Sequence, residues 1–321
     1  MRVKEIEDLI ILGDKYSFSE IEYSRLKKKF NSIIHISYKS KPFHNNIDKI
    51  NEALEQSTQR VIVLNTQAPL EKELIVYLTK LELQNVKYIT IEHFLETYLK
   101  KYFISEELSV NTAFLEEVSP YSKFQYAIKR SIDFIGIFLL FLPTLIFSLY
   151  TKFRMHKESP GSLYFEQKRV GLGGEEFNCI KLRSMHLNAE ENGAKFAKED
   201  DPRVYPWGDR IRYTKIDELG QLYNVLKGEM HLIGPRPERK IWTREFEKSI
   251  PYYAQRHVVA PGITGLAQLK YQYGRGKIDA KEKLMYDLYY IKNWSLKLEL
   301  EIIWKTLVFL LTSKKEDLSN F

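Results

Sequence analysis

Short apolar runs alternate with helical patterns over the first 120 residues. β-Branched and other apolar residues gather in four such runs: LIILG (9–13), SIIHISY (32–38), RVIVLNT (60–66) and VKYITIE (86–92). Strands that alternate with helices are typical of βα units, because neighbouring parallel strands need a crossover connection. The pattern therefore predicts a small parallel sheet covered by helices.

This part predicts a soluble, Rossmann-like parallel α/β accessory domain over residues 1–120. Loops after parallel strands can bind ligands, but Gly13 stands alone and no G-x-G-x-x-G motif follows the first run. A nucleotide site stays open as an alternative, and a dimerisation or docking module is favoured. The polar run 105–122, which contains a proline near its end, predicts the linker.

An uncharged stretch of seventeen residues, FIGIFLLFLPTLIFSLY (134–150), comes next. As a straight helix it would be roughly 25 Å long, shorter than a hydrocarbon core of roughly 30 Å. Pro143 lies at its middle and favours a kink.

Both flanks of this stretch are basic: Lys129 and Arg130 precede it, and Lys152, Arg154 and Lys157 follow it. Because positive flanks favour the cytoplasmic side, both ends are expected there. A re-entrant helix over about residues 130–153, which enters and leaves one leaflet, accommodates both flanks. A tilted single span and a buried core helix are the alternatives.

Two adjacent acids open the segment KIDELGQLYNVLKGEMHLIGPRPE (215–238). Thr214 and Asp217 have the spacing of a capping box. One amphipathic helix ending at Gly228 is predicted from four apolar positions with i, i+3, i+4 and i+7 spacing: Leu219, Leu222, Tyr223 and Leu226.

Asp217 and Glu218 have two interpretations. They can be favourable charges at a helix N-terminus, or they can be chemical groups. The second interpretation gains from Arg236, which lies between Pro235 and Pro237 and carries a planar fork suited to phosphate oxygens. A carboxylate facing a rigid guanidinium suits covalent phosphoryl transfer.

Residues 163–185 are predicted to form two strands joined across Gly171, Gly173 and Gly174. They bring together the basic residues Lys168, Arg169, Lys181 and Arg183, as a solvated or lipid-headgroup surface or as a substrate site. The run DDPR (200–203) is a turn signal or a metal-ligand candidate.

The C-terminal part contains the turn-rich PGITGLAQ (261–268), expected to be a loop, and a final amphipathic helix. One face of that helix carries Leu300, Ile303, Trp304, Leu307, Val308 and Leu311. This face is expected to lie on the bilayer surface or to pack on the domain core.

Charge and cysteine content add two constraints. Lys and Arg number 49 against 42 Asp and Glu, a net charge of +7, which favours an anionic partner such as nucleic acid, anionic lipid or a phosphorylated substrate. Nucleic acid is disfavoured, because no aromatic-basic RNA motif or recognition-helix pattern is present. The single cysteine, Cys179, excludes an intramolecular disulfide framework.

From Lys129 to about Thr312 the chain resembles the bacterial sugar transferase family, the monotopic polyprenyl-phosphate phosphoglycosyl transferases with one re-entrant helix. The resemblance is carried by the order and spacing of KRSIDFIG, FEQKRVGLGGEEF, KLRSM, DDPR, IDELGQLYNVLKGEM, IGPRPE, PGITGLAQ and YYIKNWSL. Two departures are Leu142-Pro143 for the usual Ser-Pro bend and Leu219-Gly220 for Leu-Pro after the acids.

The resemblance implies roles for matched residues. Asp217 would attack the β-phosphate of a UDP-sugar, release UMP and hold the phosphosugar as an aspartyl phosphate, with Glu218 completing the dyad. Mg²⁺ would bind near Asp217. Phosphate oxygens would be held by Arg236, Lys181, Arg183 and Arg203. Polyprenyl phosphate, undecaprenyl phosphate in bacteria, would accept the phosphosugar and start membrane glycan assembly.

The resemblance also implies a mixed, mainly helical catalytic domain over residues 121–321. That domain would lie on the cytoplasmic face of the bacterial inner membrane, in contact with membrane lipids, with a homodimer as the candidate assembly. A non-catalytic membrane scaffold that recruits glycan-assembly enzymes is the alternative function.

Overall fold

The computed structural model describes residues 8–38, 44–55, 60–67, 70–84, 86–105, 116–189, 191, 193, 201–271, 274 and 276–312. The chain divides into two compact units, formed mainly by Met1–Phe103 and by Ile104–Leu318. The predicted linker begins just after this division, and its residues 106–115 lie outside the described part. The chain is thus mixed α/β, as predicted.

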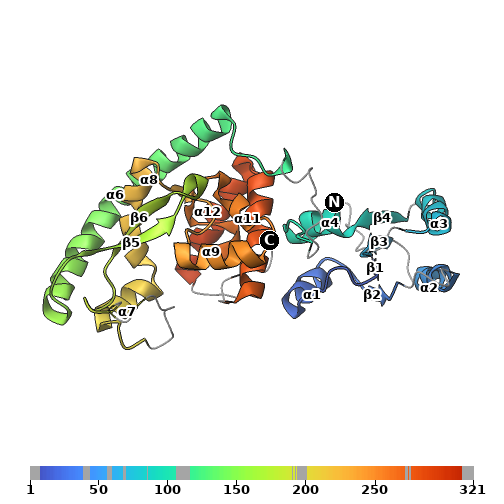
Figure 1. The fold of residues 1–321 in the computed structure, drawn as a ribbon, viewed down its shortest axis with the longest axis horizontal. Coiled ribbons are helices and arrows are strands. Elements are labelled where there is room, and N and C mark those ends of the chain that lie inside the picture. Colours follow the sequence, from blue (N-terminus) through green and yellow to red (C-terminus); the bar gives the residue numbers. More distant parts are fainter. Residues whose placement is uncertain are drawn as a thin grey trace. The chain divides into compact units, whose positions relative to one another are not determined.

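A four-stranded parallel sheet forms the centre of the N-terminal unit (Figure 1). Its strands are β1 (Asp8–Leu12), β2 (Ile33–Ile36), β3 (Arg60–Leu64) and β4 (Lys87–Thr90), in the order β2-β1-β3-β4. All four predicted strands are confirmed. Both faces of the central β1 are buried, as expected for a parallel sheet with helices on both sides.

The described residues of this unit also form five short helices: α1 (Glu20–Lys27), α2 (His44–Glu55), α3 (Lys72–Glu82), α4 (Ile91–Phe94) and the π-helix η1 (Leu95–Leu99). Figure 1 shows α2 and α3 on one side of the sheet and α1 and α4 on the other. The first pair packs on Ile10, Leu12 and Ile62, which share one face of the sheet.

In the loop after β1, the backbone and side chain of Asn65 occupy the space beside Gly13. Gly13 has φ +99°, and a Cβ there would lie 2.3 Å from the Asn65 carbonyl oxygen. The Asn65 side chain in turn donates to the carbonyls of Gly13 and Tyr16 at 3.1 and 3.0 Å. Gly13 therefore permits the close approach of two loops.

A 36-residue helix, α6 (Lys123–Glu158), follows a short helical turn in the C-terminal unit (Figure 1). It is longer than the uncharged stretch because the basic flanks on both sides continue the helix. Only 11% of its most apolar 18-residue window is buried, so the interpretation as a buried core helix is wrong. The helix is long and apolar enough to cross a membrane. It continues through Pro143, and the next residue, Thr144, donates its hydroxyl to the Leu140 carbonyl at 2.7 Å.

The predicted hairpin is confirmed. Strand β5 (Tyr164–Val170) pairs antiparallel with β6 (Glu176–Leu182) through the 3-10 turn η2 (Leu172–Gly174). Gly173 and Gly174 have φ values of 66° and 81°, which glycine adopts without the steric cost of a Cβ.

The rest of the unit consists of α7 (Pro206–Tyr213), η3 (Ile216–Gln221), α8 (Leu222–Lys227), β7 (His231–Ile233), α9 (Lys240–Ser249), η4 (Tyr253–Val258), β8 (Gly262–Thr264), α10 (Leu266–Lys270), α11 (Lys277–Lys292) and α12 (Leu296–Thr312). The loop predicted at 261–268 is wrong, because β8 pairs parallel with β7 and α10 follows it. A Cβ at Gly262 would lie 2.0 Å from the Gly234 nitrogen, so the two backbones pack directly on each other.

The final helix, α12, buries one face and exposes the other. Leu298 and Ile302 are buried, whereas the side chains of Trp304 and Leu311 are 65% and 84% exposed. Leu300 and Leu307, also exposed, continue the same face. Packing on the domain core therefore does not account for this apolar face.

Candidate active site

Asp217 and Glu218 lie in the short 3-10 helix η3, which directly follows α7. Thr214 ends α7 and donates its hydroxyl to the Arg210 carbonyl at 2.9 Å. The predicted capping box of Thr214 and Asp217 is therefore wrong, because the hydroxyl bonds backwards to the preceding helix. Lys215 precedes η3 with φ 62° and ψ 12°, a left-handed backbone conformation uncommon for a residue with a side chain.

The single amphipathic helix predicted across this segment is also wrong, since η3 and α8 divide it. Leu222 and Val225 are buried, but the side chains of Tyr223 and Leu226 are 52% and 50% exposed. The 3-10 turn has three residues per turn, so the 3.6-residue period does not hold across it. The predicted end at Gly228 is confirmed, with φ 84°.

Strand β6 holds this segment in place. A Cβ at Gly220 would lie 3.0 Å from the Ile180 carbonyl oxygen, so glycine lets η3 approach the strand closely. The buried Asn224 accepts from the Ile180 amide at 2.9 Å and donates to the Asn178 carbonyl at 2.7 Å. This docking brings Lys181, on the same strand, next to the acids.

Glu218 is clamped between two cations. Its Oε1 accepts from Lys181 Nζ at 3.0 Å and from Arg236 Nη2 at 2.9 Å. Burial alone would raise the pKa of Glu218, but the charges of Lys181 and Arg236 hold it well below its usual range. The two cations therefore favour the ionised form of Glu218, which holds both of them beside the neighbouring acid.

Asp217 is buried, and its Oδ1 has no hydrogen-bond partner among the described residues. Burial raises the pKa of Asp217, the charge of Lys181 lowers it, and Glu218 adds to the rise. Arg212 and Lys215 also lie close enough to favour its ionised form. An unbonded carboxylate oxygen beside cations suits the nucleophile for a phosphorylated substrate.

The backbone around Arg236 is fixed from two sides. Arg256 donates from Nη2 to the Arg236 carbonyl at 3.0 Å and to Asp287 Oδ2 at 2.7 Å. Arg169, at the end of β5, donates to the Pro237 carbonyl at 3.2 Å. Burial raises the pKa of Asp287 to about 6 although Arg256 favours its charged form. These contacts fix the backbone at Arg236, and the bond to Glu218 holds its guanidinium.

Arg183 and Arg203 have other partners in this structure. Arg183 is buried and donates to the Ser159 hydroxyl at 2.7 Å, to the Ser159 carbonyl at 2.5 Å and to the Ser162 carbonyl at 2.8 Å. Arg203 forms a bidentate pair with Asp201 at 2.8 and 2.6 Å. Asp201 thereby has the role of a turn residue, and Asp200 lies outside the described part. Phosphate binding by these two arginines stays a prediction.

Mg²⁺ is the metal that the resemblance implies for this site. Among the described residues there is no group of three or more Asp, Glu, His or Cys side chains that could hold a metal ion. Mg²⁺ is commonly held by one or two carboxylates together with substrate phosphates and water. The free Oδ1 of Asp217 fits one such ligand position, so the residues present fit a substrate-associated Mg²⁺.

A buried cluster of charged and polar groups fixes the N-terminal end of α6 to the rest of the C-terminal unit. Lys129 Nζ donates to Glu299 Oε1 at 2.6 Å, to the Tyr290 hydroxyl at 2.8 Å and to the Ile233 carbonyl at 2.8 Å. The Trp294 indole donates to the same Glu299 oxygen at 2.5 Å. These residues join α6 to β7, α11 and α12.

The opposite end of α6 is held by α7. The Trp207 amide donates to Glu158 Oε2 at 2.6 Å, and its indole donates to the Thr151 hydroxyl at 3.2 Å. The ring of Tyr150 lies edge-on to the Trp207 ring, 5.0 Å between centroids. Both ends of the apolar helix therefore contact the same folded unit.

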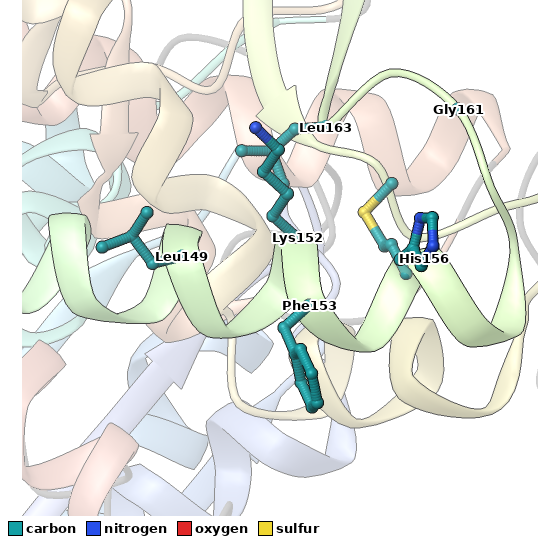
Figure 2. Close-up of a pocket in the computed structure, with 7 residues that line it drawn as sticks. Leu149, Lys152, Phe153, His156, Gly161 and Leu163 are labelled. Carbon is teal, nitrogen blue, oxygen red and sulfur yellow. The ribbon is translucent and has the colours of Figure 1, made fainter.

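A cavity of about 440 Å³ lies beside the last turns of α6. Figure 2 shows Leu149, Lys152 and His156 along the helix, with Leu163 from the following segment near the Lys152 side chain. None of the residues that line it belongs to η3. This cavity is part of the helix surface and not of the acid pair.

Several residues of the site could not be assigned a role from sequence. Arg256 and Asp287 form a buried pair, and Arg212 and Lys215 lie near Asp217. A signal for the first pair does exist: Asp287 is the single acid in the aromatic run MYDLYY. A charge inside an apolar run is rarely buried without a partner.

Comparison with known proteins adds a family assignment. The family model described as "Bacterial sugar transferase" matches residues 124–313. The UDP-N-acetylgalactosamine-undecaprenyl-phosphate N-acetylgalactosaminephosphotransferase of Aeromonas hydrophila is 45% identical over 188 residues, which are 58% of this chain and 44% of that protein.

Two proteins named UDP-glucose:undecaprenyl-phosphate glucose-1-phosphate transferase are also similar. That of Xanthomonas campestris pv. campestris is 42% identical over 160 residues, 49% of this chain and 33% of that protein. That of Caulobacter vibrioides is 38% identical over 190 residues, 58% of this chain and 70% of that protein. The chain thus spans less than half the length of the Aeromonas and Xanthomonas relatives.

Proposed function

The chain belongs to the bacterial sugar transferase family, and from that premise we propose that it is a phosphoglycosyl transferase. It transfers a sugar 1-phosphate from a UDP-sugar to polyprenyl phosphate, undecaprenyl phosphate in a bacterial membrane, and so starts glycan assembly. The printed names of the relatives supply the donor and acceptor classes. The observation that carries the proposal is the buried, unbonded Oδ1 of Asp217 beside the Lys181–Glu218–Arg236 clamp.

In the first step an oxygen of ionised Asp217 attacks the β-phosphorus of the UDP-sugar. A bond forms between that oxygen and phosphorus, the bond from phosphorus to the oxygen of UMP breaks, and UMP leaves with the electron pair. A carboxylate needs no general base, because it carries no proton to remove.

Lys181 and Arg236 stabilise the charge that develops on the phosphate oxygens. Both are positioned by Glu218 before substrate arrives, so little reorganisation is needed during the reaction. Asp217 would hold Mg²⁺ together with the substrate, and the metal would supply further charge neutralisation.

Membrane association is suggested by the exposed apolar α6 and by the family. We extend this to a monotopic arrangement, in which α6 enters and leaves one leaflet at the cytoplasmic face of the inner membrane. The support is that Lys129 and Trp207 hold the two ends of α6 to one folded unit. A bilayer cannot pass between parts of one folded unit.

The activity is tested by release of UMP from a panel of UDP-sugars, with Mg²⁺ and undecaprenyl phosphate, by the full chain in detergent. Release with one or more sugars, and none from Asp217→Asn, is the expected result. No release from any sugar by a folded protein would contradict the proposal and favour the scaffold alternative.

The membrane arrangement is tested by cysteine labelling in intact cells. Ala127→Cys and His156→Cys place exposed thiols near the two ends of α6, against a Cys179→Ser background. Labelling of both only after the inner membrane is permeabilised is expected. Labelling of just one of them before permeabilisation would indicate a single span.

A further inference from the structure

A second cavity, of about 410 Å³, lies against α7 and the first residue of η3. It is lined by Trp207, Asp209, Arg210, Tyr213, Thr214 and Ile216. Ile216 directly precedes Asp217 in the chain. Trp207 is the residue that fastens α7 to the end of α6. The cavity therefore lies beside the end of the apolar helix, and one of its lining residues is the chain neighbour of Asp217.

One cation in this cavity is available to a ligand. Arg210 is exposed, and its guanidinium donates no hydrogen bond to any residue in the part of the chain that the structure describes. Glu158 interacts with its charge, but both Glu158 carboxylate oxygens already accept from Arg154 and from the Trp207 amide. Asp209, which is exposed, also lines the cavity. An exposed arginine of this kind suits a phosphate group.

The walls of the cavity suit an amphiphile. The Tyr213 side chain is 75% exposed and Trp207 is partly buried, and such aromatic side chains are favoured at the boundary between water and lipid. Tyr150, exposed on α6, extends the apolar surface beyond Trp207.

We propose that this cavity receives the phosphate head and first isoprene units of the polyprenyl phosphate acceptor, with Arg210 holding the phosphate. This assignment rests on the proposed function and adds the acceptor site to it. Lys181 and Arg236, which reach the acids from β6 and from the segment after β7, are left to the nucleotide-sugar diphosphate.

A lipid phosphate bound in this cavity then takes part in the second chemical step. An oxygen of the lipid phosphate attacks the phosphorus of the phosphosugar carried by Asp217. A phosphorus–oxygen bond to the lipid phosphate forms, the bond to the Asp217 oxygen breaks, and the carboxylate is regenerated with the electron pair. A dianionic lipid phosphate carries no proton, so this step also needs no base.

The cavity of Figure 2 is the natural rival site, because Lys152 and His156 there lie among apolar side chains of α6. It contains no residue of η3, so a phosphate bound there would not adjoin Asp217 through the cavity wall. A variant at Lys152 therefore distinguishes the two cavities.

The experiment uses the full chain in nanodiscs and measures the two half-reactions separately. Covalent capture from the UDP-sugar is measured without lipid by quenched mass spectrometry, and transfer is then measured against the concentration of undecaprenyl phosphate. Arg210→Ala is expected to raise the KM for undecaprenyl phosphate about 10- to 100-fold, the worth of a hydrogen bond to a charged group, while capture proceeds as in the wild type. Arg210→Lys is expected to recover part of the loss. Arg244→Ala, an exposed arginine on α9, is the matched control and should change neither value.

Three outcomes would overturn the proposal. Arg210→Ala could slow capture from the UDP-sugar, which would assign the cavity to the donor. It could leave both half-reactions unchanged while Lys152→Ala raises the KM for the lipid, which would assign the acceptor to the other cavity. Phosphatidylglycerol could compete with undecaprenyl phosphate strongly in the wild type and weakly in Arg210→Ala, which would indicate that Arg210 binds lipid headgroups in general and not the acceptor.

Two further measurements complete the experiment. Inorganic phosphate should inhibit transfer in the wild type more strongly than in Arg210→Ala, because the cavity binds the phosphate group itself; equal inhibition would contradict the role of Arg210. If the wild type shows no capture, the proposed function fails and not only the acceptor site.

Discussion

The Lys129 cluster and the Asp217–Glu218 site are both sets of charged groups inside the C-terminal unit, but their polar atoms are bonded to different degrees. Lys129 has three ammonium hydrogens and three acceptors, on Ile233, Tyr290 and Glu299. Asp217 has an Oδ1 that is buried with no hydrogen-bond partner among the described residues.

This difference separates a structural charge cluster from a chemical one. An unsatisfied buried polar atom costs about 1–3 kcal/mol, so it calls for a partner that arrives with the substrate. Lys129 needs no such partner, and its bonds join α6 to β7, α11 and α12. The predictions below test this division between the two clusters.

The largest effect is expected from Asp217→Asn, which keeps the shape of the side chain and removes the charge that attacks phosphorus. Covalent capture from the UDP-sugar should fall at least about 10³-fold, while the free energy of unfolding stays within about 1 kcal/mol. Quenched mass spectrometry and urea unfolding measure the two values. Asp217→Glu is the matched control, since it keeps the charge but displaces it. A phosphosugar adduct that survives in Asp217→Asn would assign the nucleophile to another residue.

Lys129→Met should lower the free energy of unfolding, the quantity that Asp217→Asn leaves nearly unchanged. It leaves the Glu299 carboxylate buried without its cation, and the removal of one partner of a buried pair costs about 3–5 kcal/mol. Chemical unfolding in detergent, followed by tryptophan fluorescence, measures the loss. The double variant Lys129→Met, Glu299→Leu should regain part of it. If the single variant unfolds like the wild type, the cluster is not the anchor of α6.

The strands were predictable because their signals are local. Each run of the N-terminal sheet, and the glycines of the β5–β6 hairpin, carry their pattern within a few residues. The division of residues 214–228 into η3 and α8 was not predictable, because it depends on the contact of Gly220 with Ile180 on β6 and on the left-handed Lys215.

The site was predictable only in part, for the same reason. Asp217, Glu218 and Arg236 stand out within one segment, and the sequence also suggested Lys181. The structure adds that Lys181 and Arg236 meet at one Glu218 oxygen. The pairing of Lys129 with Glu299 spans 170 residues, and no local pattern indicates such a contact.

Arg236→Lys should have an intermediate effect and sharpen the role of the clamp. An ammonium cannot bond both Glu218 and a substrate phosphate in the planar geometry of a guanidinium. We expect capture to slow about 10- to 100-fold, the range for a lost charge-assisted hydrogen bond, with little change in unfolding. Arg244→Lys on α9 is the matched control. If Arg236→Lys slowed capture no more than Arg244→Lys does, the positive charge at residue 236 would matter and the geometry of its guanidinium would not.

The two acids should respond oppositely to pH, with smaller effects. The pKa of Asp217 is raised above 3.8, so its contribution to stability declines as pH rises through the window between 3.8 and the raised value. The pKa of Glu218 is lowered from 4.5, so its contribution is present above 4.5 and is lost as pH falls below it. Capture should rise with pH as Asp217 ionises.

Comparison of unfolding free energies across pH isolates each acid. The difference between wild type and Asp217→Asn should fall with rising pH, and the difference between wild type and Glu218→Gln should grow. Parallel trends in the two comparisons would contradict the assignment of one raised and one lowered pKa.

The smallest effect is expected from removal of the N-terminal unit. A chain that starts at Ile104 keeps Tyr121, whose hydroxyl donates to that of Tyr290 at 3.3 Å, and the buried Val118. Because the C-terminal unit has its own core, UMP release should stay within about 2-fold of the full chain. A chain that starts at Ser122 loses Tyr121 and Val118 and should be less stable to urea. Comparison of the two truncated chains thus distinguishes the contribution of these two residues from that of the N-terminal unit. If the chain starting at Ile104 is folded but inactive, the N-terminal unit takes part in catalysis.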